Sequence, residues 1–328
     1  MIGTDINIAI NFLKQGELVA IPTETVYGLA ANAFDSTAVT KIYQVKNRPQ
    51  FNPLIIHTDS IEKLKSWGLI LPDKLLQLAA KFSPGPLTYV IPKSAQIPDI
   101  ITAGTDAVAV RIPNHPLTLE LLSKLDFPLA APSANPSGSV SPTNAQHVQE
   151  QLGDKIPYVL DGGECKVGVE STIISFIDEI PTILRFGGLS LESIEAVIGK
   201  VNTVFSPQST VDSRQFTANK PIAPGMLSRH YATAHQLIFG DVEKNISSYN
   251  SKKVGIISFY KKYDVILDEH QFVLSEKRNL EEAAQKLFAA MREVDKQDID
   301  VILAEEFPDE GLGRAINDRL RRASVQKN

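Results

Sequence analysis

The chain contains very little cysteine, since Cys165 is the single one among its 328 residues. One cysteine cannot form an intrachain disulfide, so the sequence predicts a protein of a reducing compartment, the cytoplasm. Long apolar runs are also missing, because no stretch approaches the roughly 18 residues of a membrane span. The first segment, MIGTDINIAINFLKQG, alternates polar and apolar residues too often for a signal peptide. We therefore expect a soluble, cytoplasmic protein that does not enter a membrane.

The common signatures of nucleotide-binding and hydrolytic enzymes are absent as well. The sequence has no G-x-x-x-x-G-K-[ST], no G-x-G-x-x-G after a strand, no H-E-x-x-H and no G-x-S-x-G. It also has no cluster of cysteine and histidine with the spacing of zinc ligands, so we predict no metal site made by the protein. The net charge of −5 argues against a protein that coats nucleic acid, although it permits a local basic groove.

What is present is enough apolar sequence for two domains. With 43% hydrophobic and 22% charged residues, the composition is that of a globular protein, and 328 residues are too many for one ordinary domain. Residues 1–202 mix strands and helices without strict alternation, which favours an α/β fold with a twisted mixed sheet and covering helices. Residues 203–234 are polar and contain prolines, as in a linker or a lid. Residues 235–328 alternate strands and helices, which predicts a smaller Rossmann-like α/β domain with a largely parallel sheet.

Apolar spacing and capping residues give the expected elements. Helices are predicted at residues 4–15, 35–48, 60–68, 73–82, 115–125, 143–153, 190–200 and 279–296. Strands are predicted at residues 17–21, 52–58, 86–92, 107–113, 127–135, 158–163, 171–176, 182–187, 236–240, 253–260 and 298–307.

Polar and basic side chains gather where these strands end. They are Thr23, Thr25, Lys46, Arg48, Asn52, His57, Arg111, Ser133, Asn135, Ser171, Thr172 and Arg185. Ligands of open α/β sheets bind at such strand ends. Four basic groups beside hydroxyls and amides suit a phosphate and a carboxylate bound together.

Taken singly, each of these residues also has a purely structural explanation. Thr23 and Thr25 suit a turn or a helix cap, and Lys46 and Arg48 suit the negative end of a helix dipole. His57 suits a half-buried strand position, the S-A-N segment suits a turn, and the two later arginines suit pairing with surface carboxylates. Periodicity alone does not show that these residues converge.

Four blocks of sequence, in order, carry a resemblance to a known family. PTETVYGL, KNRPQFNPLIIH, APSANPSG and PGMLSRHY closely resemble the YrdC-like family, and the second domain is similar to its long, two-domain form. The resemblance implies an enzyme that combines L-threonine, bicarbonate or CO2, and ATP into threonylcarbamoyl-AMP and pyrophosphate. It also implies a partner, the threonylcarbamoyl transferase complex, which modifies the adenosine next to the anticodon of certain tRNAs. A transient contact with tRNA itself belongs to the same expectation.

The resemblance also implies roles for individual residues. The positions that match threonine-binding residues are Thr25, His57, Arg111 and Ser171. The positions that match ATP-binding residues are Lys46, Arg48, Asn52, Ser133, Asn135, Ser141 and Arg185. Lys46 and Arg48 would be catalytic by offsetting phosphate charge together with Mg2+, which arrives with ATP. Ala107 departs from the family, because some relatives have a nucleotide-contacting threonine there, and Thr102 and Thr105 are the nearby substitutes.

A labile carbamate requires a site that closes during the reaction. The segment of residues 203–234 is the candidate lid, with Gly225 as a hinge and with Arg229, His230 and Tyr231 reaching the ligands. Gly28 is expected to let the backbone pass close to a ligand or to the sheet.

The last helix and two other functions complete the expectations. GLGRAINDRLRRAS contains Arg314, Arg319, Arg321 and Arg322, which we interpret as cations of a solvated final helix. A contact with tRNA, ATP or a partner is the alternative for this helix. The alternatives for the whole protein are an RNA-binding factor and a carbamoyl-transfer enzyme of metallocofactor maturation. Net acidity weighs against the first, and the lack of a cysteine-based zinc finger weighs against the second.

Overall fold

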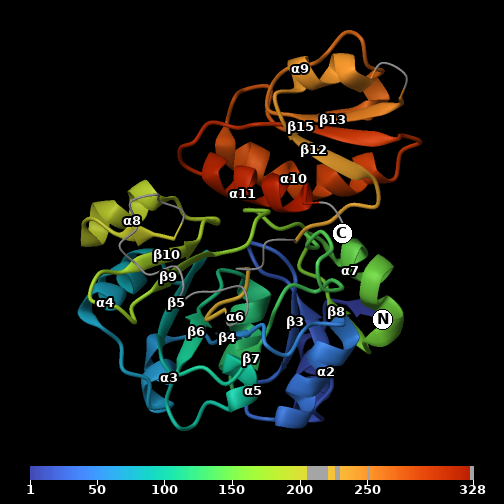
Figure 1. Cartoon of the computed structure of the whole chain (residues 1–328). Coiled ribbons are helices and arrows are strands. Elements are labelled where there is room, and N and C mark those ends of the chain that lie inside the picture. The colour runs from blue at the N-terminus through green and yellow to red at the C-terminus, as the bar shows by residue number, and fades with distance from the viewer. Residues whose placement is uncertain (205–220, 226–229, 250–251, 326–328) are drawn as a thin grey trace.

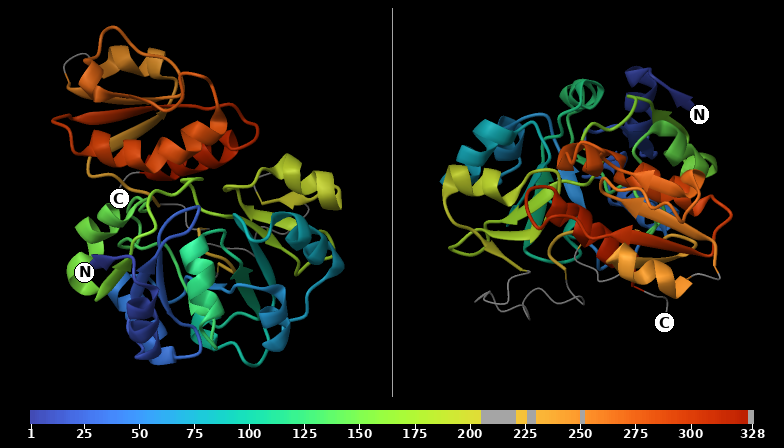
Figure 2. Two further views of the ribbon diagram at one scale, coloured as in Figure 1. Left: turned by 180° about the vertical axis from the view of Figure 1, so that it is seen from behind. Right: turned by 90° about the horizontal axis from the view of Figure 1, so that it is seen from above.

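The computed structural model describes residues 1–204, 221–225, 230–249 and 252–325, and these form two α/β domains built on separate sheets. In Figure 1 the second domain lies against one end of the first, and the view from behind in Figure 2 shows the same arrangement. Of the helices in these described ranges, none is long and apolar enough to cross a lipid bilayer.

The first domain contains an eleven-stranded mixed sheet. Its spatial order is β1 (Ile2–Gly3), β8 (Tyr158–Leu160), β2 (Val19–Ile21), β3 (Gly28–Asn32), β7 (Leu129–Ala130), β4 (Ile55–His57), β6 (Ala107–Arg111), β5 (Leu87–Pro92), β9 (Thr172–Ser175), β10 (Thr182–Arg185) and β11 (Asn202–Thr203). The sheet contains both parallel pairs, such as β4 with β6, and antiparallel pairs, such as β5 with β6. The predicted twisted mixed sheet is confirmed.

Eight α-helices accompany this sheet among the described residues. They are α1 (Ile6–Lys14), α2 (Ser36–Lys46), α3 (Ile61–Ser66), α4 (Asp73–Phe82), α5 (Asp99–Thr102), α6 (Pro116–Ser123), α7 (Ala145–Leu152) and α8 (Leu191–Ile198). The helix most important for the site, α2, begins where the Asp35 carboxylate accepts hydrogen bonds from the N–H groups of Thr37 and Ala38. It ends at Asn47, which adopts a left-handed conformation with φ 50°. Lys46 and Arg48 therefore flank the helix end beside the sheet.

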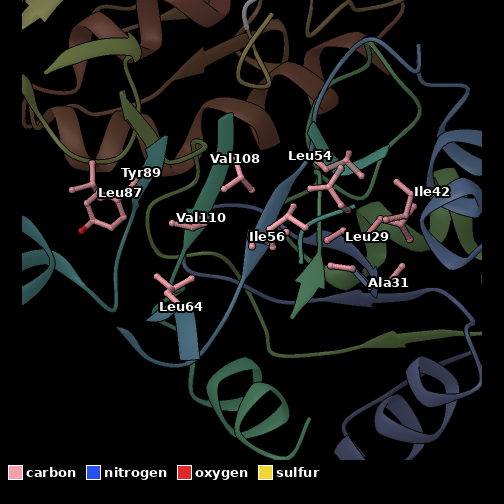
Figure 3. Packing of buried hydrophobic residues seen from close by; sticks show 14 of the residues in the cluster. Leu29, Ala31, Ile42, Leu54, Ile56, Leu64, Leu87, Tyr89, Val108 and Val110 are labelled. Atoms are coloured by element: carbon pink, nitrogen blue, oxygen red, sulfur yellow. The ribbon is translucent and has the colours of Figure 1, made fainter. Parts of the chain in front are cut away.

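The core of the first domain lies between the sheet and these helices. Figure 3 shows side chains of β3, β4, β5, β6 and α2 packed together in it. The labelled residues of these elements are Leu29, Ala31, Ile56, Leu87, Tyr89, Val108, Val110 and Ile42, and all are buried. Burial of this contiguous apolar surface is the main stabilising contribution to the domain.

One strand of this core, β3, was not predicted. Its sequence, Gly-Leu-Ala-Ala-Asn, has weak strand propensity, but antiparallel pairing with β2 on one side and β7 on the other makes it a central strand. The expected close approach at Gly28 is to the sheet, since a Cβ atom there would lie 3.2 Å from the Cβ of Ala131.

The second domain is a smaller parallel sheet, as predicted. Its order is β12 (Gln236–Gly240), β15 (Val301–Glu305), β13 (Val254–Ser258) and β14 (Gln271–Val273), with every pair parallel. In Figure 1, α9 (Val242–Ile246) lies on one side of this sheet, whereas α10 (Leu280–Asp295) and α11 (Gly313–Ala323) lie on the side that faces the first domain. The two longest helices of this domain are therefore the ones at the domain boundary.

The interpretation of the final helix as solvated is wrong for Arg319. This side chain is 0% exposed and forms an ion pair with Glu170 of the first domain. Further along the boundary, Arg314 contacts Glu192 at 2.6 Å. The reason is the position of α11: it lies between the small sheet and the first domain, so both of its sides are covered.

Candidate active site

The turn after β2 holds two buried threonine hydroxyls. Thr23 Oγ1 accepts hydrogen bonds from the N–H groups of Thr25 (3.1 Å) and Val26 (3.2 Å) and donates to the carbonyl oxygen of Val26 (2.6 Å). The Thr25 hydroxyl lies 2.8 Å from Thr23 Oγ1. Because Thr23 donates its only hydroxyl proton to Val26, Thr25 is the donor in this pair. The lone pairs of Thr25 Oγ1 therefore stay available to a ligand N–H group.

Between these threonines, Glu24 forms a buried ion pair with Arg111 at the end of β6. Arg111 Nη2 lies 2.9 Å from Glu24 Oε2, which also accepts a hydrogen bond from the N–H of Asn114 at 3.0 Å. Glu24 Oε1 and Arg111 Nη2 make no aligned hydrogen bond to the described residues. The pair is thus a contact between charges that leaves hydrogen-bonding capacity on the guanidinium for an acidic ligand.

His57 lies beside Arg111, because β4 and β6 are parallel and the two residues are register partners. Its side chain is buried, and Nδ1 has no hydrogen-bond partner among the described residues. Burial and the adjacent Arg111 charge lower the pKa of His57 to about 3. His57 is therefore neutral at physiological pH and can accept or donate one hydrogen bond.

Lys46 anchors the segment that contains Ser133 and Asn135. Its ammonium group is almost fully buried and donates to the carbonyl oxygens of Ser133 (2.6 Å) and Asn135. The backbone N–H of Ser137 donates in turn to the carbonyl of Lys46 at 2.7 Å. Burial and the charge of Arg48 lower the pKa of Lys46 well below its ordinary value. Through its hydrogen bonds to Ser133 and Asn135, Lys46 uses two of its three N–H donors to hold this loop.

Arg48 orders the segment that follows α2. Its guanidinium donates from Nε to the carbonyl oxygen of Asn52 (3.1 Å) and from Nη2 to that of Pro53 (2.8 Å). The side-chain oxygens of Asn52 and Asn135 are buried without a partner among the described residues. Since buried polar atoms are normally satisfied, these amide oxygens indicate a place for ligand donors.

Arg185 and Ser171 form a second anchored pair on β10 and the entry to β9. Arg185 donates from Nε (3.1 Å) and Nη2 (2.9 Å) to the carbonyl oxygen of Ser171, and also to its hydroxyl at 3.2 Å. The Ser171 hydroxyl lies 2.7 Å from Thr88 Oγ1. Both predicted residues are therefore placed by hydrogen bonds, with most of the guanidinium already oriented.

The important residue that sequence reasoning missed is Glu170. One of its oxygens accepts a hydrogen bond from the predicted Ser141 hydroxyl at 2.7 Å. Burial would raise the pKa of Glu170, but the charges of Arg319 and Arg185 and the Ser141 hydrogen bond hold it at about 2. The only available sequence signal was its place next to the predicted Ser171.

These groups surround one small cavity of about 50 Å³. Six of the residues predicted to bind substrate line it, namely Arg48, His57, Arg111, Ser133, Ser171 and Arg185. Three of the six are arginines, and Glu170 is the one carboxylate among the described lining residues. A cavity with this excess of positive charge binds anions. Thr25, Lys46, Asn52, Asn135 and Ser141 are buried but are not part of its lining.

The candidate lid is only partly described. His230 lines the cavity, and burial together with nearby cationic groups lowers its pKa to about 3. Tyr231 is turned toward the second domain, where its ring stacks on Phe288 with centroids 5.3 Å apart. Gly225 has φ 85°, and a Cβ atom there would lie 2.7 Å from Cδ of Arg185. Arg229 lies outside the described residues.

The suggested substitutes for the missing threonine at position 107 are occupied by backbone contacts. The Thr105 hydroxyl donates to the carbonyl oxygens of Thr102 (2.9 Å) and Ala107 (3.2 Å), and Thr102 bonds to Asp99. Neither hydroxyl lines the cavity, so the structure brings no hydroxyl from these two positions to it.

Comparison with known proteins extends over both domains. The Sua5/YciO/YrdC family model, described as Telomere recombination, matches residues 11–187. A second model, described as Threonylcarbamoyl-AMP synthase, C-terminal domain, matches residues 189–325.

Full-length relatives and a solved structure agree with these matches. The threonylcarbamoyl-AMP synthase of Pyrococcus abyssi is 44% identical, over 97% of this chain and 94% of the relative. That of Bacillus subtilis is 41% identical, over 95% of this chain and 90% of the relative. The crystal structure of P. abyssi Sua5 complexed with L-threonine superposes with a TM-score of 0.87 at 45% identity, covering 97% of this chain and 94% of that one.

Proposed function

The chain belongs to the two-domain threonylcarbamoyl-AMP synthase family, and on this premise we propose that it condenses L-threonine, bicarbonate or CO2, and ATP into threonylcarbamoyl-AMP. The observation that carries the proposal is the convergence of Arg48, Arg111 and Arg185, from three separate parts of the chain, on one cavity in which all three side chains are buried. L-Threonine and ATP both carry anionic groups, and planar guanidinium groups recognise carboxylates and phosphates by paired hydrogen bonds.

L-Threonine would occupy the side of the cavity at the ends of β4 and β6. Arg111 would bind the amino-acid carboxylate, because its charge is present there and its Nη2 makes no aligned hydrogen bond. Neutral His57, Thr25 with its accepting lone pairs, and Ser171 would contact the amine and the side-chain hydroxyl. The P. abyssi relative bound to L-threonine supports this choice of ligand.

ATP would lie toward α2 and the loop that contains Ser133 and Asn135. Arg48 and Arg185 would contact the phosphates, and Lys46 would hold the loop with a third donor left for the nucleotide. The unpartnered amide oxygens of Asn52 and Asn135 would accept hydrogen bonds from donors on the nucleotide or its bound water. Ser141 would complete this side through its link to Glu170.

Mg2+ would come with ATP, bound to its phosphates. The described residues contain no group of three or more His, Cys, Asp or Glu side chains that could hold a metal ion. When bound, the ion would neutralise phosphate charge. The arginines would orient the same phosphates from the protein side.

The reaction then needs positioning more than covalent help from the protein. The threonine amine attacks CO2, or bicarbonate with loss of water, to form a carbamate. A carbamate oxygen attacks the α-phosphorus of ATP, the bond to the β-phosphate oxygen breaks, and pyrophosphate leaves. Arg48 and Arg185 would stabilise the charge that develops on the phosphates, and the buried cavity would keep water from the carbamate.

The experiment is pyrophosphate release from the purified full chain with Mg2+, ATP, bicarbonate and L-threonine, omitting one component at a time. Release that requires both threonine and bicarbonate, with a new adenylate peak on chromatography, is the expected result. Release that needs neither would indicate a nucleotide hydrolase and would contradict the proposal.

The product would pass to a threonylcarbamoyl transferase complex that modifies tRNA in the cytoplasm. We favour this outcome over metallocofactor maturation, because the segment after the YrdC-like domain is the synthase C-terminal domain. An RNA-binding factor without turnover is the remaining alternative, and its mark would be salt-sensitive RNA affinity without ATP consumption.

A further inference from the structure

The second domain reaches the candidate active site through one fully buried side chain on α11. Arg319 donates from Nε (3.1 Å) and Nη2 (3.0 Å) to Oε2 of Glu170, and from Nη1 to the carbonyl oxygen of Phe186. Both acceptors belong to the first domain, and Arg319 is 0% exposed. This fork of two N–H groups on one carboxylate is a charge-assisted contact with a defined orientation.

Glu170 connects that contact to the ligand-binding groups. Its second oxygen accepts the hydrogen bond from Ser141, and its own carbonyl accepts one from the N–H of Gly188 at 2.9 Å. The next residue, Ser171, is held by Arg185. Glu170 also lines the cavity itself. A shift of this carboxylate would therefore move residues assigned to both substrates.

We infer that Arg319 is a positioning residue for the reaction, by which the second domain holds Glu170, and through it Ser141 and Ser171, in the geometry that binds ATP and threonine. The inference rests on the proposed function. It gives the second domain a direct part in the active site, because the first domain supplies Glu170 whereas the second domain supplies its ion-pair partner, Arg319.

Charge explains why the contact is needed. Glu170 is faced by Arg319 of α11, by Arg185 of β10, and by His230 and Tyr231 of the segment between the domains, and Asp318 of α11 contacts Arg319. His230 is neutral, and Asp318 is paired with Arg319 and Arg322. Removing Arg319 would leave a buried carboxylate that only the charge of Arg185 still stabilises strongly, and such a group takes up a proton or moves toward water.

The experiment compares the full chain with Arg319→Met, Arg319→Lys, Glu170→Gln and the double variant Arg319→Met with Glu170→Gln. Arg314→Met is the matched control, because Arg314 is on the same helix and makes a domain-boundary ion pair with Glu192, and neither residue lines the cavity. Each protein is assayed for threonine- and bicarbonate-dependent pyrophosphate release between about pH 5.5 and about pH 8, and its unfolding is followed by circular dichroism.

Arg319→Met is expected to lower kcat/KM by roughly 10- to 100-fold, the order that misplacement of a site group by about 1 Å produces. Its activity relative to the parent chain should fall further as the pH falls, because Glu170 then becomes protonated in this variant alone. Adding Glu170→Gln should remove that extra pH dependence, and Arg319→Lys, which keeps the cation, should also lack it. Arg314→Met should retain activity.

The inference is overturned if folded Arg319→Met keeps the parent kcat/KM, or if Arg314→Met loses as much. It is also overturned if the loss in Arg319→Met is the same at every pH. If Arg319→Met fails to fold, Glu170→Gln carries the test, and full activity in that variant would refute the inference. Failure of the proposed function is distinguished by the parent chain itself, which would then show no release that depends on threonine and bicarbonate.

Discussion

Arg48 orders a segment of the fold and would provide charge for phosphate, and Arg48→Ala removes both contributions at once. The free energy of unfolding measures the loss of the first, and kcat/KM measures the loss of the second. The two hydrogen bonds of Arg48 to the carbonyl oxygens of Asn52 and Pro53 contribute about 1.5–3 kcal/mol each, as bonds from a charged donor. Against this, burial lowers the pKa of Arg48 to about 10. At about 1.4 kcal/mol per pKa unit, that lowering corresponds to about 3 kcal/mol of unfavourable burial.

The two contributions largely offset each other. Arg48→Ala should therefore lower the free energy of unfolding by no more than about 3 kcal/mol, which leaves a protein of ordinary stability folded. Its effect on the reaction should be larger. Loss of two charge-assisted hydrogen bonds to phosphate, at about 1.5–3 kcal/mol each, corresponds to a decrease of roughly 10²- to 10⁴-fold in kcat/KM.

Tyr43→Phe is the matched control for the structural task. The Tyr43 hydroxyl donates to the carbonyl oxygens of Ile100 (3.0 Å) and Asn52 (3.4 Å), so this variant loosens the same segment without removing charge. Pyrophosphate release and urea unfolding should be measured for both variants. Tyr43→Phe should be destabilised by about 1 kcal/mol and stay active. Near-normal turnover in Arg48→Ala, or an equal loss in Tyr43→Phe, would refute the reasoning.

Four other outcomes follow from the site. Arg111→Lys should raise KM for L-threonine roughly tenfold or more and change KM for ATP little, because lysine keeps the charge but loses the planar fork; an equal rise for both substrates in steady-state kinetics would contradict this. Thr25→Val, of similar shape, should also raise KM for L-threonine, by roughly tenfold, through loss of one hydroxyl; isothermal titration with threonine checks it. EDTA should stop pyrophosphate release without changing the thermal unfolding midpoint, and a lowered midpoint would reveal a metal held by the protein. Burial holds the pKa values of His57, His147 and His230 at about 3, 4 and 3. Below about pH 6.5 these histidines bind protons in the unfolded chain but not in the folded one. The free energy of unfolding should therefore decrease as the pH is lowered, by up to about 1.4 kcal/mol per pH unit for each histidine. Equal stability by urea unfolding at about pH 7.5 and about pH 5.5 would contradict that assignment.

Local sequence was sufficient for the parts of the site that depend on neighbouring residues. Asp35 begins α2 and Asn47 ends it, so the positions of Lys46 and Arg48 follow from a cap and a left-handed residue close by in the chain. Thr23 closes its turn through atoms within three residues. The sequence blocks that resemble the YrdC-like family lie in such segments, which is why most of the polar side chains that line the cavity were predicted.

The tertiary structure decided what depends on residues far apart in the chain. The Gly-Leu-Ala-Ala-Asn segment becomes β3 only because two other strands pair with it. Arg319 and Glu170 are separated by 149 positions, and no local pattern marks either as the partner of the other. By itself the sequence determined most of the elements, the local turns and the family. Only the fold decided that the last helix would be buried at the domain boundary, because a charge can remain buried there when packing brings it to an opposite charge.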